Sequence, residues 1–114
     1  MTHRVGIIDY GAGNLRSVYQ AIQYLKIEVD VISDSSSFSN FTHLILPGVG
    51  SFRRAMLSLK VRQFDRIIRE LVNSGIPILG ICLGMQLLAS RGSEDGETLG
   101  LGLISGDVDR FSFD

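Results

Sequence analysis

The stretch Gly80–Ile81–Cys82–Leu83–Gly84–Met85–Gln86 contains the only cysteine of the 114-residue chain, with a glycine two positions to either side. The apolar residues 76–79 before it predict a buried strand, and residues 85–89 after it predict a helix. Cys82 is therefore expected on a sharp strand-to-helix turn, the geometry of a nucleophile elbow, which holds a reactive side chain exposed above the sheet edge. A Cβ at either glycine would crowd so tight a turn.

This position gives the cysteine a chemical role. At the start of a helix, unpaired N–H groups and the helix dipole favour a thiolate over a thiol. The alternative is a buried structural cysteine, which is the commoner role of a lone Cys. Because of the flanking glycines, we favour an enzyme with a cysteine nucleophile.

Composition limits the other possibilities. The length fits one domain, and 45% apolar with 20% charged residues is typical of soluble globular proteins. A net charge of −1 argues against general binding to nucleic acid or to an anionic membrane. One cysteine excludes an internal disulfide, and the N-terminus has no secretory or transit character. We therefore predict a cytoplasmic protein, with neither a metal site nor a cofactor.

Positive charge is concentrated in one segment of the chain. A solvated helix face explains this cluster more simply than a phosphate site does. Its members are Arg53, Arg54, Lys60, Arg62, Arg66 and Arg69.

The order of predicted elements indicates the fold class. Strands alternating with helices are typical of an open, mostly parallel α/β sheet with helices on both faces. After residue 90 we expect a loop at 91–96 and then a hairpin. The predicted strands are 5–9, 28–32, 43–46, 76–79 and the hairpin strands 100–104 and 107–113; the predicted helices are 15–25, 52–59, 64–73 and 85–89.

Ligands of such sheets bind beyond the carboxyl ends of the strands, where three turns of this chain meet: 11–14, 47–50 and the elbow. Attack by a thiolate on an acyl carbon needs two donors for the oxyanion. The N–H of Leu83 can supply one, and the loop of Gly48, Val49 and Gly50 the other, although these residues could equally form a simple turn.

Two further residues near these turns bear on ligand binding. Arg16 stands where a dinucleotide fingerprint has its third glycine, which disfavours a nucleotide cofactor. Gln86 could bind a polar end of the substrate or be an ordinary surface residue. Residue type alone leaves both readings open.

A thiol nucleophile also needs a base, and the chain has two histidines. His3 precedes the first strand. His43 opens the third strand, at the end of the sheet opposite to the elbow. Neither is expected to serve Cys82.

The motifs together resemble a known family. Residues 80–88 resemble the nucleophile elbow of class I (triad-type) glutamine amidotransferases. Within that family, residues 7–14, 47–52 and 100–111 resemble the glutaminase subunits that work with a cyclase in histidine biosynthesis. The resemblance spans residues 1–114 but covers only the N-terminal half of a family domain. It implies a flavodoxin-like α/β fold, truncated on its C-terminal side.

The resemblance also implies an activity. Such enzymes hydrolyse glutamine to glutamate and ammonia through a γ-glutamyl thioester, and pass the ammonia to a (β/α)₈-barrel cyclase. The residue roles that it implies are Cys82 as nucleophile, Leu83 with loop 47–50 as oxyanion hole, Gly84 and Gln86 as glutamine contacts, and Asn14 at the partner interface.

The family's catalytic histidine and glutamate fall in a stretch that this sequence does not contain. We therefore expect no appreciable glutaminase activity from the chain alone, and an exposed sheet edge that promotes association. Two alternatives stay open. The chain could be a paralogue that serves another synthase, or a non-catalytic binding module.

Overall fold

The structure is a computed structural model that describes residues 2–112. Among these residues, no helix is long and apolar enough to cross a membrane. Phe113, the last residue of a predicted strand, lies outside the described part. The elements are β1 Arg4–Ile8, α1 Leu15–Tyr24, β2 Glu28–Ile32, a 3₁₀ turn Ser35–Ser37, β3 His43–Leu46, α2 Phe52–Val61, α3 Phe64–Asn73, β4 Ile78–Gly80, α4 Leu83–Leu87, β5 Ala89–Gly92, β6 Thr98–Leu99 and β7 Ile104–Val108.

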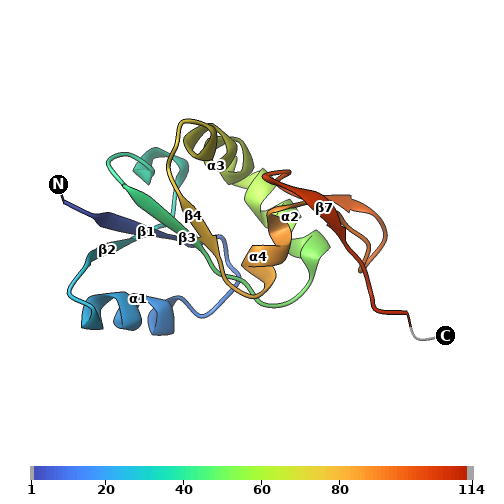
Figure 1. Ribbon diagram of the computed structural model, residues 1–114, viewed down its shortest axis with the longest axis horizontal. Helices are drawn as coiled ribbons and strands as arrows, with labels where there is room; N and C mark the ends of the chain where they lie inside the picture. Colours follow the sequence, from blue (N-terminus) through green and yellow to red (C-terminus); the bar gives the residue numbers. More distant parts are fainter. Residues whose placement is uncertain (1, 113–114) are drawn as a thin grey trace.

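The main sheet has four parallel strands in the order β2-β1-β3-β4. Helix α1 lies on one face, while α2 and α3 lie on the other (Figure 1). The predicted parallel sheet with helices on both faces is therefore confirmed. In such a sheet the turns that leave β1, β3 and β4 reach the same edge.

The apolar runs of the strands are explained by burial on both faces. In β1, Ile7 joins a cluster with Val29 and Ile45 on the α1 side. The next residue, Ile8, joins the larger core that contains Phe64 and Ile68 of α3. Successive strand residues thus supply two separate cores.

The hairpin predicted for residues 100–104 and 107–113 is wrong. Strand β7 pairs in parallel with β5, and β6 pairs antiparallel with the other side of β5. The N–H groups of Leu101 and Leu103 donate to the carbonyls of Leu87 and Leu88, at 2.8 and 2.9 Å. Leu101 is 2% exposed and packs against the main core. Its burial therefore holds residues 100–103 as a connection rather than as a strand.

The predicted loop at 91–96 also needs correction, because its first two residues belong to β5. Elsewhere the boundaries agree with those predicted to within two residues, and those of β2, β3 and α3 agree at both ends. Helix α4, for example, begins at Leu83, two residues before the predicted start.

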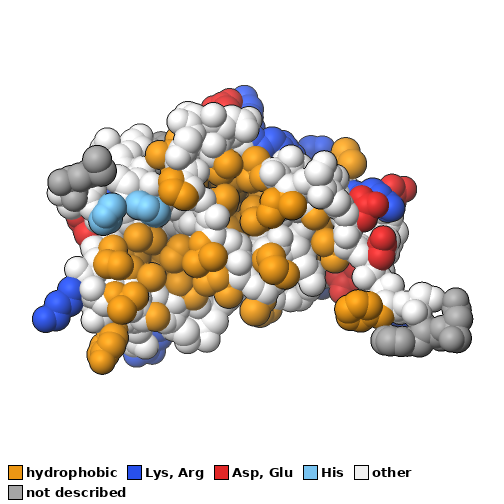
Figure 2. All heavy atoms as spheres, viewed as in Figure 1, with side chains coloured by type: hydrophobic (Ala, Val, Ile, Leu, Met, Phe, Trp, Pro, Cys, Tyr) orange, Lys and Arg blue, Asp and Glu red, His pale blue; other side chains and the backbone are white. Residues whose placement is uncertain are grey.

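Strand β4 pairs only with β3 among the described residues. Leu79 of β4 and Met85 of α4 are 57% and 56% exposed. Figure 2 shows hydrophobic side chains gathered over β4 and toward α1 and α4. These are the features from which self-association was expected, and association stays a prediction.

Candidate active site

The turn from β4 to α4 holds Cys82 in an unusual backbone conformation. Its φ is 54° and its ψ −119°, and the residue is exposed. A residue with a Cβ pays about 1–3 kcal/mol for such a conformation, so the surrounding structure must impose it. The Ile81 N–H donates to the carbonyl of Leu46 at 3.0 Å and the Gly84 N–H to that of Ile81 at 2.9 Å, which fixes the turn on both sides of Cys82.

The two flanking glycines are required by close packing. A Cβ on Gly80 would lie 2.6 Å from the Cα of Met85. A Cβ on Gly84 would overlap the carbonyl oxygen of Leu46 in β3. The steric reason given for both glycines is confirmed. Gly84 is buried by this packing, and its contact with substrate stays a prediction.

The β3–α2 loop, residues 47–51, contacts the elbow directly. The N–H of Leu83, which we predicted as an oxyanion donor, donates to the carbonyl of Gly48 at 3.2 Å. Val49 is 65% exposed, and a Cβ on Gly50 would meet no atom within 4 Å. To serve an oxyanion, the Leu83 N–H must first lose the Gly48 carbonyl. The oxyanion roles of this loop and of Leu83 therefore stay predictions.

Tyr10 anchors this loop, a role that the sequence did not reveal. Its side chain is fully buried, and its hydroxyl donates to the Pro47 carbonyl at 2.6 Å. Burial raises the pKa of Tyr10 well above that of an ordinary phenol, so the hydroxyl keeps its proton at neutral pH. The available signal was a large aromatic residue two positions after β1, where a glycine turn begins.

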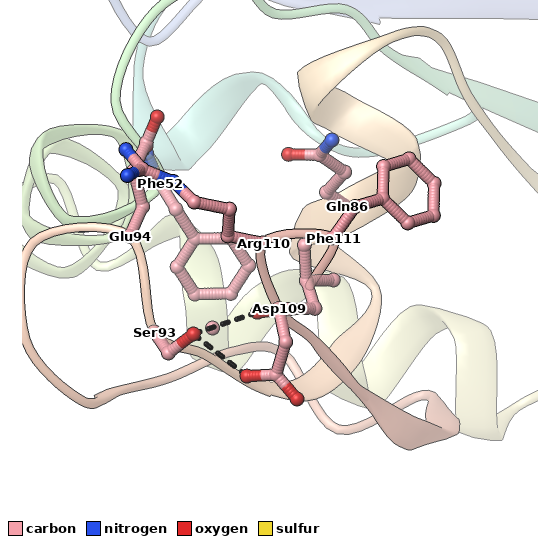
Figure 3. A pocket seen from close by; sticks show the side chains of 9 residues that line it. Phe52, Gln86, Ser93, Glu94, Asp109, Arg110 and Phe111 are labelled. Atoms are coloured by element: carbon pink, nitrogen blue, oxygen red, sulfur yellow. Dashed lines mark hydrogen bonds between the residues drawn. The ribbon is translucent and has the colours of Figure 1, made fainter. Parts of the chain in front are cut away.

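A cavity of about 570 Å³ lies beside α4. Figure 3 shows the Gln86 side chain pointing into it, with Glu94 and Arg110 on one side and Phe111 on the other. The Glu94 carboxylate accepts a hydrogen bond from the N–H of Phe52 at 3.0 Å. The residues that line the cavity are Phe52, Gln86, Gly92, Ser93, Glu94, Val108, Asp109, Arg110 and Phe111.

Gln86 is the only cavity residue that we had predicted. Glu94 was assigned to a polar loop and Arg110 to a hairpin strand, and both reach the cavity because β5 and β7 pair in parallel. Ser93 fixes this wall of the cavity, since its hydroxyl donates to Asp109 Oδ1 at 2.6 Å (Figure 3).

Both histidines lie away from the elbow. His43 is the first residue of β3, at the amino end of the sheet, and its ring is 5.2 Å from that of His3. Cys82 follows the carboxyl end of the neighbouring strand β4. Within residues 2–112, therefore, no imidazole faces the sulfur. The same residues contain no group of three His, Cys, Asp or Glu side chains that could hold a metal ion.

Asn14 has a structural role at the start of α1, where its side chain accepts a hydrogen bond from the N–H of Ser17 at 3.3 Å. Asn14 is therefore the N-cap residue of α1. Its position at a partner interface stays a prediction.

Comparison with known proteins identifies the family. The chain matches the family model "Glutamine amidotransferase class-I" over residues 6–98. It belongs to this family. The chain is 51% identical over 93% of its length to "Imidazole glycerol phosphate synthase subunit HisH" of Geobacillus sp. (strain WCH70), and 48% identical over 95% to the protein of that name from Chlorobaculum tepidum. These matches cover 50% and 54% of the relatives, so the chain spans about half their length.

Solved structures agree on the fold. One titled "Crystal structure of glutamine amidotransferase" superposes with a TM-score of 0.79 at 24% identity, over 93% of this chain and 56% of that one. Another, "Structure of PurLQS from Thermotoga maritima", gives a TM-score of 0.63 at 24% identity, over 77% of this chain and 43% of that one. At this identity, the likeness shows the fold alone.

Proposed function

We propose that this amidotransferase chain carries the nucleophile of a glutaminase that supplies ammonia for histidine biosynthesis. The observation that carries the proposal is the exposed Cys82 in a strained elbow conformation. The pathway is inferred from the names of relatives that are 51% and 48% identical to this chain. A structural cysteine would need neither exposure nor strain.

The chemistry proceeds in two steps. The Cys82 thiolate bonds to the side-chain carbonyl carbon of glutamine, the C–N bond breaks, and the amide nitrogen takes up a proton and leaves as ammonia. Water then attacks the γ-glutamyl thioester, which releases glutamate and restores the thiol. Both steps move protons, and the elbow faces no imidazole within residues 2–112. We propose that an imidazole from another segment or chain completes the site.

The cavity beside Gln86 would hold the amino-acid end of glutamine. Glutamine carries an α-ammonium group and an α-carboxylate. Glu94 offers a negative partner for the first, Arg110 offers a positive partner for the second, and the Gln86 amide can donate or accept (Figure 3). Because Gln86 lies one helical turn after Cys82, a molecule in the cavity would present its far end to the sulfur.

The partner belongs to the same proposal. The relatives are named as synthase subunits, and we propose that the ammonia passes to a cyclase subunit, expected to be a (β/α)₈ barrel. The turn of Asn14 opens at the same sheet edge as the elbow, and is the proposed contact. Immobilised cyclase subunit should capture the chain, and Asn14→Ala should be captured less. No capture of either would contradict this pairing.

A glutamate assay tests the need for an external base. Without one, turnover should be lower than that of an intact amidotransferase by roughly two to four orders of magnitude. Comparable turnover would overturn this part of the proposal.

Covalent labelling tests the nucleophile separately. A chloromethyl ketone analogue of glutamine should alkylate Cys82, as detected by mass spectrometry of the digested protein. Excess glutamine should protect Cys82, and Cys82→Ser should stay unlabelled. Labelling that glutamine does not slow would refute a glutamine site beside this cysteine.

A further inference from the structure

A second cavity, of about 440 Å³, opens between the β1–α1 turn and one face of α2. Gly11 and Gly50, both with positive φ, bring backbone to its wall. Arg54, Ser58 and Arg62 line its α2 side. Because these three residues are four positions apart, they lie on one helix face.

The Arg62 guanidinium is held toward this cavity. Its Nη1 donates to the Ser58 hydroxyl at 2.6 Å, and that hydroxyl donates in turn to the carbonyl of Tyr10. Arg62 therefore folds back along α2, and the residue stays exposed. A Cβ on Gly11 would lie 3.6 Å from Arg62 Nη2, so the guanidinium lies beside the exposed glycine turn.

The two arginines of the cavity differ from the two arginines of α3. Arg69 pairs with Asp65 at 3.6 Å, and Arg66 with Glu70 at 3.9 Å. Within residues 2–112, Arg54 and Arg62 form no ion pair, and no acidic side chain lines the cavity.

The acidic groups of the neighbouring loops already have partners. Asp9 Oδ1 accepts from the Gly11 N–H at 3.2 Å, and Asp95 Oδ2 accepts from the Ser51 hydroxyl at 2.9 Å. Two guanidinium groups thus face one cavity without an anion. A phosphate oxyanion is a group that accepts charge-assisted hydrogen bonds from guanidiniums.

We propose that this cavity binds a small phosphorylated molecule, with the phosphate between Arg54 and Arg62. The volume lies in the range of small-molecule sites and exceeds what one carboxylate side chain would fill. A guanidinium donates two parallel hydrogen bonds to phosphate, and Ser58 orders Arg62 for that contact in advance.

Titration with inorganic phosphate tests the site on the full chain. The amide NMR signals of Gly11 and Gly50 should shift to saturation with phosphate, but not with sodium chloride at equal ionic strength. Arg54→Gln and Arg62→Gln should each weaken binding about tenfold or more, since each removes charge-assisted hydrogen bonds. Arg66→Gln, which removes an arginine of α3, should leave the affinity unchanged. Circular dichroism checks that each variant is folded.

Shifts that do not saturate, or an affinity that survives both cavity substitutions, would overturn the proposal. A third outcome would also overturn it: the chain does not bind phosphate, and Arg62→Gln weakens its capture by the cyclase subunit. The arginines would then bind a carboxylate of that protein. Cys82→Ser should leave phosphate binding intact. A failure of phosphate binding can therefore be distinguished from a failure of the glutaminase proposal.

Discussion

Two turns at the same sheet edge differ in how much of each is closely packed. The elbow, residues 80–84, is fixed by steric exclusion, because neither of its glycines has room for a Cβ. The β3–α2 loop is closely packed only in its first half. Gly48 has no room for a Cβ, and the carbonyls of Pro47 and Gly48 accept hydrogen bonds, whereas Val49 and Gly50 are open. Both turns follow a buried strand and precede a helix.

The difference shows what each turn can contribute to a reaction. A nucleophile must be aimed, and the elbow leaves Cys82 one backbone conformation. An oxyanion donor must face the substrate only while charge develops, and the loop has space to rearrange on its outer side. Substitutions in the two turns test whether the elbow tolerates less change than the outer half of the loop.

Gly84→Ala should have the largest effect. The new methyl group overlaps the Leu46 carbonyl, and separating β3 from α4 should cost about 3 kcal/mol, more than the helix gains from alanine. Gly50→Ala is the matched control. It meets no atom within 4 Å, and with a φ of 103° it should lose only about 1 kcal/mol. Urea unfolding measures both, and equal losses would contradict the contrast.

The elbow could be predicted from the sequence because its cause is local. Apolar runs and bracketing glycines can be read in the sequence itself, and they predict the main sheet and the position of Cys82. The second sheet could not be predicted in this way. Strand β7 joins β5 because Leu101 is buried in the main core, and sequence alternation carries no information about that contact.

The same limit applies to the site. Gln86 was found because it lies one turn along the elbow helix, whereas Glu94 and Arg110 reach the cavity only through the pairing of β5 with β7. Tyr10 was missed for a similar reason. Its partner, Pro47, is 37 residues away, and an aromatic residue beside a glycine turn does not reveal a buried hydrogen bond.

Tyr10→Phe tests the anchor of the loop. The substitution keeps the ring and removes the donor to the Pro47 carbonyl, so a buried acceptor is left unpaired at a cost of about 2 kcal/mol. Tyr24→Phe is the control, because Tyr24 is 86% exposed and should change stability little. A loss at Tyr10 no larger than at Tyr24 would show that the hydroxyl does not hold the loop.

Alkaline pH should lower the free energy of unfolding that Tyr10 contributes. Burial raises the pKa of Tyr10 in the folded state, so above about pH 10 the unfolded chain loses a proton that the folded chain keeps. Stability contributed by Tyr10 is complete below that pH and then falls by up to about 1.4 kcal/mol per pH unit. Tyr10→Phe should remove this slope from urea-unfolding curves, and Tyr24→Phe should not. Identical slopes in all three proteins would rule the mechanism out.

Cys82→Gly should have the smallest effect and the opposite sign. Glycine adopts a φ of 54° without the penalty of a Cβ, and after its greater loss of backbone entropy on folding a gain of about 1 kcal/mol remains. Cys82→Ala keeps the Cβ and should gain nothing. Urea unfolding of both variants separates release of strain from loss of the sulfur. If the Cys82→Gly variant is no more stable than Cys82→Ala, the elbow holds Cys82 without strain. Exposure alone would then mark Cys82 as the nucleophile.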